Sequence, residues 1–519
     1  MNEPDVLTET FVDAGPLFTL LSSIDHQILF GRRGTGKTHA LKYLAESMRR
    51  NGDIAIYLDA RVLGSTGGIY TDPNVPLKER GTRLLVDVLT EITDALERYT
   101  LGLESDVIGD ESVFPLLDKL ADEVTTIRVV GTVEVETKRT DGAIDEGAFG
   151  IAATIGSKPS MSMSASDKAT ASHQTERRVK EVGVEHHRVH FGAVSGLLRD
   201  IGSRLPASRI WILLDEWSAI PLELQPMLAD FIRRAVLPVQ GITVKLGAIE
   251  QRSRFRIAVG EGDYLGIEVG ADMSADVDLD DFMVFGNDPD RAKNFFRELL
   301  FKHLRAVYVK EGRQADAPRT ADELITSVFT QRNAFDEFVR AAEGVPRDAI
   351  NIVSLAVQRA NSAAVSVAHV RGAARTWYQR DKENAVADKN ARDLLNWVID
   401  EVIGKRRARA CLVLQGSGGT SHPLIISLFD SRVLHVVKKG VSAKDQPGVR
   451  FDAYALDYGC YVELVSTAKE PKGLFQVENE DASAFVEVPA DDYRSIRNAV
   501  LDLEAFERRA PVDRPSQRP

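Results

Sequence analysis

The chain has 519 residues, a length typical of about three domains. Apolar residues make up 44% of it and charged residues 27%, a balance that is typical of a soluble globular protein and excludes a disordered, collagen-like or membrane-embedded chain. The 77 Asp and Glu residues outnumber the 65 Lys and Arg residues, and the formal net charge is −12. An anionic partner would therefore bind to a local basic patch rather than to the whole surface.

The two cysteines, Cys411 and Cys460, are too few for a disulfide scaffold or a cysteine-based metal site. This usage predicts a reducing, cytoplasmic location. The first residues lack the basic start and apolar stretch of a secretory signal, and no uncharged apolar run approaches the roughly 18 residues of a membrane helix. We therefore expect neither export nor a helical membrane anchor.

Four short apolar runs predict the buried strands of one sheet. They are His26–Phe30, Ile54–Leu58, Ile210–Leu214 and Ile242–Ile249. Helical patterns alternate with these runs, which is typical of an α/β fold with a parallel sheet.

A long insertion separates the second strand from the third. It begins with an amphipathic helix over Leu77–Leu103, and then two Val- and Thr-rich segments, Val124–Arg139 and Glu176–Phe191, predict an inserted β-hairpin. A helix over Ala193–Leu205 returns the chain to the sheet. The hairpin tip, Gly147–Ser172, is rich in Gly, Ala, Ser and Met. A flexible loop tip, a partner-contacting arm and a membrane-inserting strand are three interpretations of it, and membrane insertion is the weakest.

The remainder of the chain predicts two further domains. Apolar residues at three- and four-residue spacing indicate an all-α lid, with helices over Arg291–Tyr308, Ala321–Phe329, Ala334–Ala342, Asp348–Asn361 and Val365–Tyr378. A small winged-helix-like domain follows, with helices over Ala391–Ile403 and His422–Phe429 and strands over Ala410–Leu414, Leu434–Val437 and Tyr454–Val465. The predicted domains are 1–287 for the core, with the hairpin at about 123–192, 288–384 for the lid, 385–507 for the winged-helix-like domain and 508–519 for a disordered tail.

The strongest motif lies between the first strand and its helix. Residues Gly31–Thr38 fit the pattern G-x-x-x-x-G-K-[ST] without a gap. In such a loop backbone N–H groups surround phosphate oxygens and the helix N-terminus adds positive potential. The residues expected to bind a nucleotide are Gly31, Gly34, Thr35, Gly36, Lys37 and Thr38, with Lys37 at the β- and γ-phosphates and the Thr38 hydroxyl on Mg²⁺.

The third strand supplies a second part of this site. Its apolar run ends in Asp215 and Glu216, and the carboxyl end of a central parallel strand lies next to the phosphate loop. We expect Asp215 to orient the Mg²⁺ shell and Glu216 to polarise the attacking water. Two acids favour hydrolysis over nucleotide binding alone, so ATP and Mg²⁺ are the predicted cofactors.

These motifs, together with the segment Gly344–Val353, resemble the AAA+ ATPases of the initiator type, which include origin-recognition and cell-division-control proteins. The resemblance spans about Leu17–Asn361 apart from the hairpin. It implies that Arg347 contacts the γ-phosphate as the sensor 2 arginine. The position of sensor 1 falls on Glu250, which departs from the small polar residue usual there.

The resemblance also implies a homo-oligomer, a ring or open spiral, in which an arginine of one subunit completes the site of its neighbour. The candidates for this role are Arg233 and Arg234, and also Arg252 and Arg254.

Between Glu401 and Arg450 nine basic residues face three acidic ones, in a chain that is negative overall. In a winged helix Lys438, Lys439 and Lys444 would lie near the wing, where they could contact the phosphates of double-stranded DNA. A protein-binding wing is an equally good interpretation.

The sequence thus predicts an ATP-hydrolysing AAA+ switch that oligomerises with nucleotide and acts on DNA or a DNA-bound protein partner. One alternative is a signalling or antiphage-defence ATPase of the STAND type, whose hairpin is the output arm toward a partner or a membrane. The other is an interaction module in which ATP is structural.

Overall fold

The computed structural model describes residues 3–13, 15–63, 68–103, 111–125, 127–138, 176–187, 189–259, 262–280, 288–404, 409–416, 419–442, 448–465 and 499–509. The chain divides into two compact units. The first comprises Met1–Leu63, Ala207–Arg233 and Gln240–Pro519, and the second comprises Gly64–Pro206 and Arg234–Val239. The predicted boundaries at residues 287 and 384 stay predictions.

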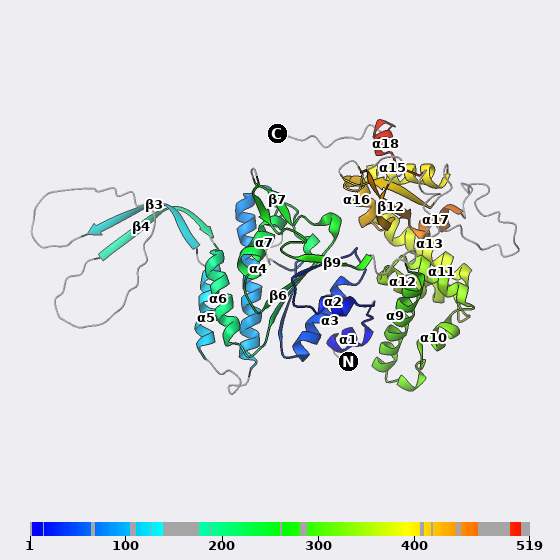
Figure 1. The fold of residues 1–519 in the computed structure, drawn as a ribbon, viewed down its shortest axis with the longest axis horizontal. Coiled ribbons are helices and arrows are strands. Elements are labelled where there is room, and N and C mark those ends of the chain that lie inside the picture. Colours follow the sequence, from blue (N-terminus) through cyan, green and yellow to red (C-terminus); the bar gives the residue numbers. More distant parts are fainter. Residues whose placement is uncertain are drawn as a thin grey trace, which may run out of the picture. The chain divides into compact units, whose positions relative to one another are not determined.

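The described residues of the first unit contain a parallel sheet of five strands in the order β2-β5-β6-β1-β9. Strands β6 and β9 of this sheet are labelled in Figure 1. The strands are β1 (Gln27–Phe30), β2 (Ile54–Asp59), β5 (Ile210–Asp215), β6 (Ile242–Ala248) and β9 (Ser274–Asp278). Every residue of β5 and β6 is buried, as expected for central strands covered on both faces. The four predicted strands are confirmed, and all five strands end at the same edge.

The fifth strand, β9, was not predicted. Its sequence, Ser-Ala-Asp-Val-Asp, contains only the apolar residues Ala275 and Val277, so that neither a buried run nor a clear alternation marks it. Val277 is nevertheless fully buried against the sheet core. Pairing with β1 makes this short polar segment a strand.

A shared apolar core joins the sheet to the helices around it. Helix α3 (Lys37–Arg50) buries Leu41 and Leu44 against Leu29 and Leu213 of the sheet. The lid helices contribute to the same core, and its aromatic contacts include Phe296 against Phe338. These helices are α9 (Pro289–Lys310), α10 (Ala321–Val328), α11 (Arg332–Ala342), α12 (Pro346–Ala360) and α13 (Val367–Trp377). All five predicted lid helices are thus present.

The C-terminal part forms a separate antiparallel sheet in the order β10-β12-β11. Its elements are α15 (Lys389–Val398), β10 (Ala410–Leu414), α16 (Pro423–Asp430), β11 (Leu434–Ser442), β12 (Arg450–Leu456), α17 (Tyr458–Val465) and α18 (Leu503–Arg509). The order helix, strand, helix and strand hairpin agrees with the winged-helix-like prediction. Helix α18 extends to Arg509, and residues 510–519 of the predicted tail lie outside the described residues.

One C-terminal prediction is wrong. The strand expected over Tyr454–Val465 ends at Leu456, and the rest is helix α17. Asp457 causes this change because its Oδ1 accepts hydrogen bonds from the peptide nitrogens of Gly459 at 2.9 Å and Cys460 at 3.3 Å. An aspartate that binds the first free N–H groups starts a helix.

Where the second unit is described, it contains three α-helices and the hairpin (Figure 1). The helices are α4 (Leu77–Leu101), α5 (Phe114–Thr125) and α6 (Phe191–Arg204), and the strands are β3 (Ile127–Lys138) and β4 (Glu176–His187). The two strands pair antiparallel along their whole length, which confirms the predicted hairpin. Its tip, 147–172, lies outside the described residues. Among the helices that are described, none combines the length and the apolar character needed to cross a bilayer.

Short elements complete the two units. They are the helices α1 (Glu3–Thr10), α2 (Leu17–Leu21), α7 (Gln225–Phe231) and α14 (Glu383–Ala385), the strands β7 (Arg256–Ala258) and β8 (Tyr264–Gly266), the 3₁₀ helices η1 (Glu111–Val113), η2 (Trp217–Ala219), η4 (Glu250–Arg252) and η5 (Gln314–Asp316), and the π-helical turns η3 (Ile232–Val236), η6 (Tyr378–Lys382) and η7 (Ile399–Gly404).

Candidate nucleotide site

The glycine-rich loop joins β1 to the N-terminus of α3. Gly34 and Gly36 have φ angles of 86° and 101°, which favour glycine because a Cβ is strained there. Gly36 is the N-cap of α3, and no side chain caps this helix. The first N–H groups of α3 therefore have no side-chain partner and form an anion-binding terminus.

A cavity of about 690 Å³ opens in front of this terminus. It is lined by residues of the loop, by Glu216 after β5 and by Arg347 of the lid. Among the described residues that line it, the cationic side chains are Arg33, Lys37, Lys42, Arg61 and Arg347, whereas Glu216 is the single carboxylate. The concentration of positive charge around an uncapped helix N-terminus suits a polyanion such as a triphosphate.

Lys37 lies at the base of the loop. Its Nζ donates to the carbonyl oxygens of Gly31 at 2.7 Å and Arg32 at 3.0 Å. Burial lowers the pKa of this lysine, and the negative charges of Asp280 and Glu216 oppose that shift. The ammonium group is thus buried and held beside the cavity by carbonyl oxygens of its own loop.

Asp215 is completely buried at the end of β5. Its Oδ2 accepts a hydrogen bond from the Tyr57 hydroxyl at 2.8 Å, and its Oδ1 accepts one from the peptide nitrogen of Glu216 at 2.8 Å. On the neighbouring strand, a Cβ at Gly247 would lie 2.6 Å from Oδ1, so the glycine leaves room for the carboxylate. Tyr57 was not identified as a site residue from the sequence, because a tyrosine within an apolar strand is usually a packing residue.

Glu216 has a left-handed backbone, with φ at 55°, which is rare for a non-glycine residue and occurs often at functional sites. Its Oε1 lies 3.7 Å from Nη1 of Arg61, whose guanidinium also contacts Asp59 at 2.6 Å. Asp59 and Asp215 are register partners in the sheet. The carboxyl ends of β2 and β5 therefore bring three acids and one arginine together. Sequence reasoning did not identify Arg61 as a site residue. Its position just beyond the end of a predicted strand was the one indication that it could be.

Arg347 lies where the lid meets the loop. It is in the first turn of α12, after the N1 residue Pro346, and its peptide nitrogen donates to the carbonyl oxygen of Gly34 at 3.3 Å. A Cβ at Gly34 would lie 2.9 Å from the Cβ of Arg347. The structure therefore brings Arg347 to the same cavity as Lys37, Thr38 and Glu216.

An apolar slot of about 40 Å³ lies next to Thr35 and Gly36 of the loop. Its apolar lining consists of Phe11, Val12, Leu17, Ala40, Leu279, Phe295, Leu299 and Pro346. His39 also lines it and interacts through Nε2 with the carbonyl oxygen of Leu7 at 2.8 Å. Burial lowers the pKa of His39. The sequence did not indicate this slot because its members come from five separate stretches of the chain, 10–17, 35–40, 279, 295–299 and 346.

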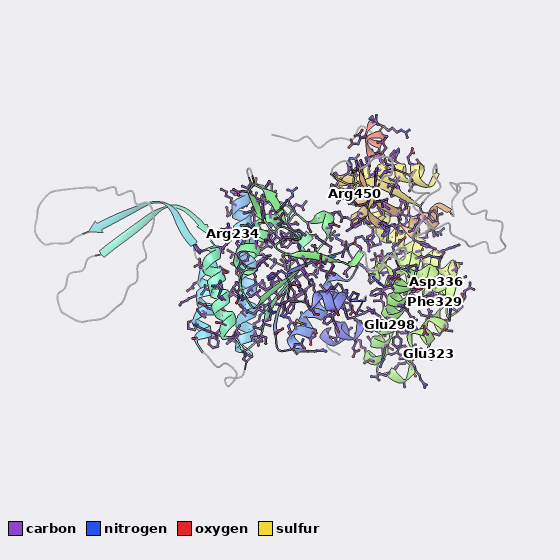
Figure 2. The ribbon with its side chains drawn as sticks, in the orientation of Figure 1. Arg234, Glu298, Glu323, Phe329, Asp336 and Arg450 are labelled. Atoms are coloured by element: carbon purple, nitrogen blue, oxygen red, sulfur yellow. The ribbon has the colours of Figure 1, made fainter. Side chains whose placement is uncertain are left out.

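Four arginines were candidates for the trans-acting finger. Arg252 forms an ion pair with Asp430, and neither it nor Arg254 is among the described residues lining the nucleotide cavity. Arg233 and Arg234 lie in different settings. Arg233 forms an ion pair with Asp230 at 2.8 Å and stacks on the ring of Tyr264 at 4.6 Å. Arg234 is exposed, with its guanidinium 5.3 Å from the ring of Phe191 (Figure 2). Neither is among the described residues that line the nucleotide cavity. A role for either of them in a neighbouring subunit stays a prediction.

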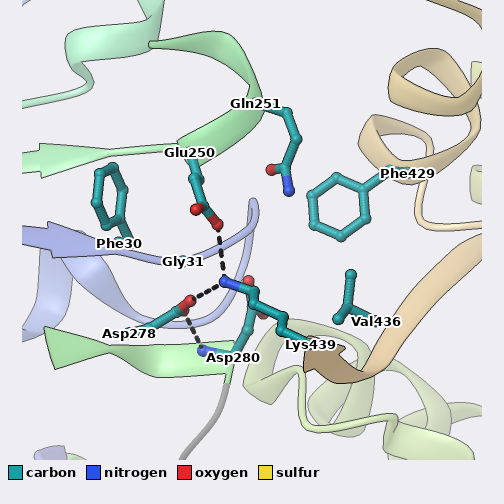
Figure 3. Close-up of a pocket in the computed structure, with 9 residues that line it drawn as sticks. All are labelled: Phe30, Gly31, Glu250, Gln251, Asp278, Asp280, Phe429, Val436 and Lys439. Atoms are coloured by element: carbon teal, nitrogen blue, oxygen red, sulfur yellow. Dashed lines mark hydrogen bonds and ion pairs between the residues drawn. The ribbon is translucent and has the colours of Figure 1, made fainter. Parts of the chain in front are cut away.

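The predicted DNA-contacting lysines also differ from one another. Lys439 Nζ lies 2.7 Å from Glu250 and 2.8 Å from Asp278, in ion pairs between β11 and the edge of the parallel sheet (Figure 3). Burial alone would lower the pKa of Lys439, but the two carboxylates outweigh it and raise the pKa. Lys438 and Lys439 are both exposed, so the ion pairs of Lys439 distinguish it, and Lys444 lies outside the described residues. Glu250, the weak sensor 1 candidate, thus contacts Lys439 and is not among the described residues lining the nucleotide cavity.

A parallel sheet with a glycine-rich loop between β1 and α3, an acidic strand end and a helical lid has the architecture of the AAA+ P-loop class. A family model described as ORC-CDC6-like matches residues 2–68. This match confirms, for the segment that holds the phosphate loop, the resemblance to initiator-type ATPases predicted from the sequence. No curated protein sequence matches the chain.

The solved structures similar to this chain include two that contain DNA. One is the Orc1 protein of Aeropyrum pernix in complex with DNA, at 13% identity and a TM-score of 0.31, with 89% of this chain and 95% of that chain covered. The other is Drosophila ORC bound to DNA, at 11% identity and a TM-score of 0.30, with 89% and 90% covered.

Proposed function

We propose that this protein is an ATP-hydrolysing AAA+ switch of the initiator type. The observation that carries the proposal is a single cavity lined by the uncapped N-terminus of α3, Lys37, Thr38, Glu216 and Arg347. Phosphate binding, metal binding, water activation and γ-phosphate sensing each need one of these groups. A glycine-rich turn with another purpose would not need all of them in one place.

The phosphates would lie against the amides of Gly34–Lys37 and the five cationic side chains of the lining. Lys37 now donates to two loop carbonyl oxygens, and a β- or γ-phosphate oxygen would offer its ammonium group a charged acceptor. Arg347 approaches from the lid and would contact the terminal phosphate. The lid would then respond to whether that phosphate is present.

The residues present also fit a magnesium ion held together with a nucleotide. Within the described part of the chain, no cluster of three or more His, Cys, Asp or Glu side chains could hold a metal by itself. Mg²⁺ binds through few protein oxygens when phosphates supply others. The Thr38 hydroxyl would be the direct protein contact, and the buried Asp215 would orient the shell of the ion. The ion would neutralise phosphate charge. Glu216 would accept the proton of the attacking water.

The apolar slot beside Thr35 is the candidate site for an adenine base at the other end of the ligand, and at about 40 Å³ it would have to widen to admit a purine. A flat aromatic base buries well between aliphatic and aromatic side chains, and Phe11, Leu17 and Leu299 offer such surfaces. His39 and nearby backbone groups would form hydrogen bonds with the edge of the base. This arrangement supports a nucleoside triphosphate rather than pyrophosphate alone.

We further propose that the protein forms a nucleotide-dependent homo-oligomer and that its C-terminal domain contacts double-stranded DNA or a DNA-bound partner. The support for DNA contact is the basic excess between Glu401 and Arg450 within that domain, together with the exposure of Lys438 on β11. Arg450 on β12 is exposed as well (Figure 2). Such contacts would be with phosphates and therefore salt-dependent. The alternative with the hairpin as output arm depends on residues 147–172, and no described contact favours it.

Binding of ATP to the full-length protein tests the proposal. Titration of a fluorescent ATP analogue, with and without Mg²⁺, should give saturable binding that Lys37→Ala reduces at least 100-fold. Lys119→Ala is the matched control, since Lys119 is exposed on α5 and lies in the other unit. Equal binding by wild type and Lys37→Ala would contradict the proposed site.

A further inference from the structure

Arg32 is a buried cation inside the phosphate loop. The loop pattern does not specify this position, yet the arginine is only 2% exposed. Its Nε contacts Asp280 at 2.7 Å, its peptide nitrogen donates to the same carboxylate at 2.9 Å, and Nη2 donates to the carbonyl oxygen of Glu343 at 3.2 Å. Its remaining terminal nitrogen, Nη1, contacts Nδ1 of His435, in the C-terminal domain. A buried charge is stable only when it is paired in this way.

His435 has the hydrogen-bonding pattern that this contact requires. A guanidinium can only donate, so Nδ1 must be an acceptor and the ring proton lies on Nε2. Nε2 in turn lies 3.1 Å from Oδ2 of Asp457, which accepts that proton's hydrogen bond. Burial and the charge of Arg32 lower the pKa of His435 to about 3, which keeps the ring neutral.

Asp457 connects this pair to the lid. Its Oδ2 also accepts from Lys382 Nζ at 2.5 Å, and the same ammonium lies 2.9 Å from Asp348. Asp348 directly follows Arg347 in α12. Burial would raise the pKa of Asp457, but Lys382 and His435 outweigh it and lower the pKa. A continuous chain of buried polar side chains therefore runs from the phosphate loop through the C-terminal domain to the residue beside Arg347.

The position of Arg32 also determines the surroundings of Lys37. The carbonyl oxygen of Arg32 accepts hydrogen bonds from Lys37 Nζ at 3.0 Å and from the Thr35 hydroxyl at 2.8 Å. A shift of Arg32 would therefore move Lys37, which lines the nucleotide cavity, and Thr35, which lines the adjoining slot. Phosphate binding by backbone amides depends on their position to within fractions of an ångström.

We propose that His435 and Asp457 are positioning residues of the nucleotide site, which hold the phosphate loop in its binding geometry through Arg32. This inference rests on the proposed function, since it assigns the C-terminal domain a part in the same site. Nucleotide affinity then depends on the docked C-terminal domain. By linkage, bound nucleotide stabilises the docking of that domain.

The test uses the full-length protein and compares substitutions at two histidines of the same domain. His435→Leu removes both hydrogen bonds and should weaken ATP binding at least 10-fold. His435→Gln, whose amide oxygen can accept from Arg32 and whose amide nitrogen can donate to Asp457, should bind within about threefold of wild type. His422→Leu is the control, because His422 contacts Glu507 and the start of α16 and should leave affinity unchanged. Equal affinity of His435→Leu and wild type would overturn the inference.

A second measurement needs no variant and covers the case in which His435→Leu does not fold. Hydrogen exchange of β11 and α17 in the wild-type protein should slow at least threefold when ATP is added. If ATP binds and exchange in β11 and α17 does not change, the inference is wrong while the proposed function stands. If wild-type protein does not bind ATP at all, the proposed function fails first.

Discussion

The peptide nitrogen of Arg347 donates to the carbonyl oxygen of Gly34 at 3.3 Å, so the first turn of the lid helix α12 lies directly against the phosphate loop. Position 34 has no side chain, and this allows the close approach. A residue that is 313 positions distant in the sequence thereby lines the same cavity as Lys37. The contact places the lid arginine where the terminal phosphate of a nucleotide would lie.

Gly34→Ala should therefore weaken ATP binding at least 10-fold. The new Cβ would lie 2.9 Å from the Cβ of Arg347, and the φ of 86° is itself strained for alanine. Gly52→Ala is the matched control because Gly52 has a φ of 87° and open space around its Cβ position. A titration in which both variants bind ATP equally well would show that the contact between loop and lid does not matter for affinity.

Tyr57→Phe should slow phosphate release about 10-fold, because Asp215 loses the hydroxyl that orients its carboxylate. Tyr70→Phe removes a similar hydrogen bond, to Asp87, in the other unit of the chain. Each variant should lose about 1 kcal/mol of stability, the usual value of one hydrogen bond. Measuring steady-state phosphate release and the thermal melting curve of each variant separates the loss of turnover from the loss of stability. Equal rates of phosphate release by Tyr57→Phe and Tyr70→Phe would exclude a positioning role for Tyr57.

The sequence was sufficient to predict the elements whose side chains follow a clear period. Four buried strands, five lid helices and the β-hairpin are present as predicted. The phosphate loop could be recognised because its glycines, Lys37 and Thr38 are contiguous. Asp215 and Glu216 could be placed beside it because parallel strands end at one edge of a sheet.

The remaining parts depend on contacts between distant segments. The polar strand β9 exists because it pairs with β1, and helix α17 begins at Asp457 because that side chain caps it. The basic segment around Lys439 did not predict its ion pairs with Glu250 and Asp278, because both acids lie more than 150 residues away in the sequence. No local pattern signals such tertiary contacts.

The neutral His435 predicts a pH dependence of stability. Its pKa is about 3 in the folded protein, against an ordinary value of 6.5, and it faces Arg32, Asp457 and Lys382. Below pH 6.5 the unfolded chain takes up a proton that the folded chain does not, so stability falls as the pH decreases. Between pH 7 and pH 5 the wild type should lose about 2 kcal/mol more unfolding free energy than His435→Gln. Urea unfolding at both pH values measures the difference, and parallel losses would contradict a neutral buried histidine.

The lysines of β11 should respond differently to charge reversal. Lys438→Glu should weaken binding to double-stranded DNA at low salt and leave the melting temperature within about 1 °C, since the side chain is exposed. Lys439→Glu should lower the melting temperature because a third carboxylate would lie beside Glu250 and Asp278. Fluorescence anisotropy over a salt series, with thermal melts, checks both. Unchanged DNA binding by Lys438→Glu would remove the support for contact through this strand.

Phosphate release by Glu216→Gln tests most directly whether the acidic end of β5 hydrolyses the nucleotide held by the loop. Glutamine keeps the size of the side chain at a position that already has a left-handed backbone, but it cannot accept a proton from water. The variant should bind ATP with wild-type affinity and release phosphate at least 100-fold more slowly. Turnover at the wild-type rate by Glu216→Gln would contradict the proposed hydrolysis at this site.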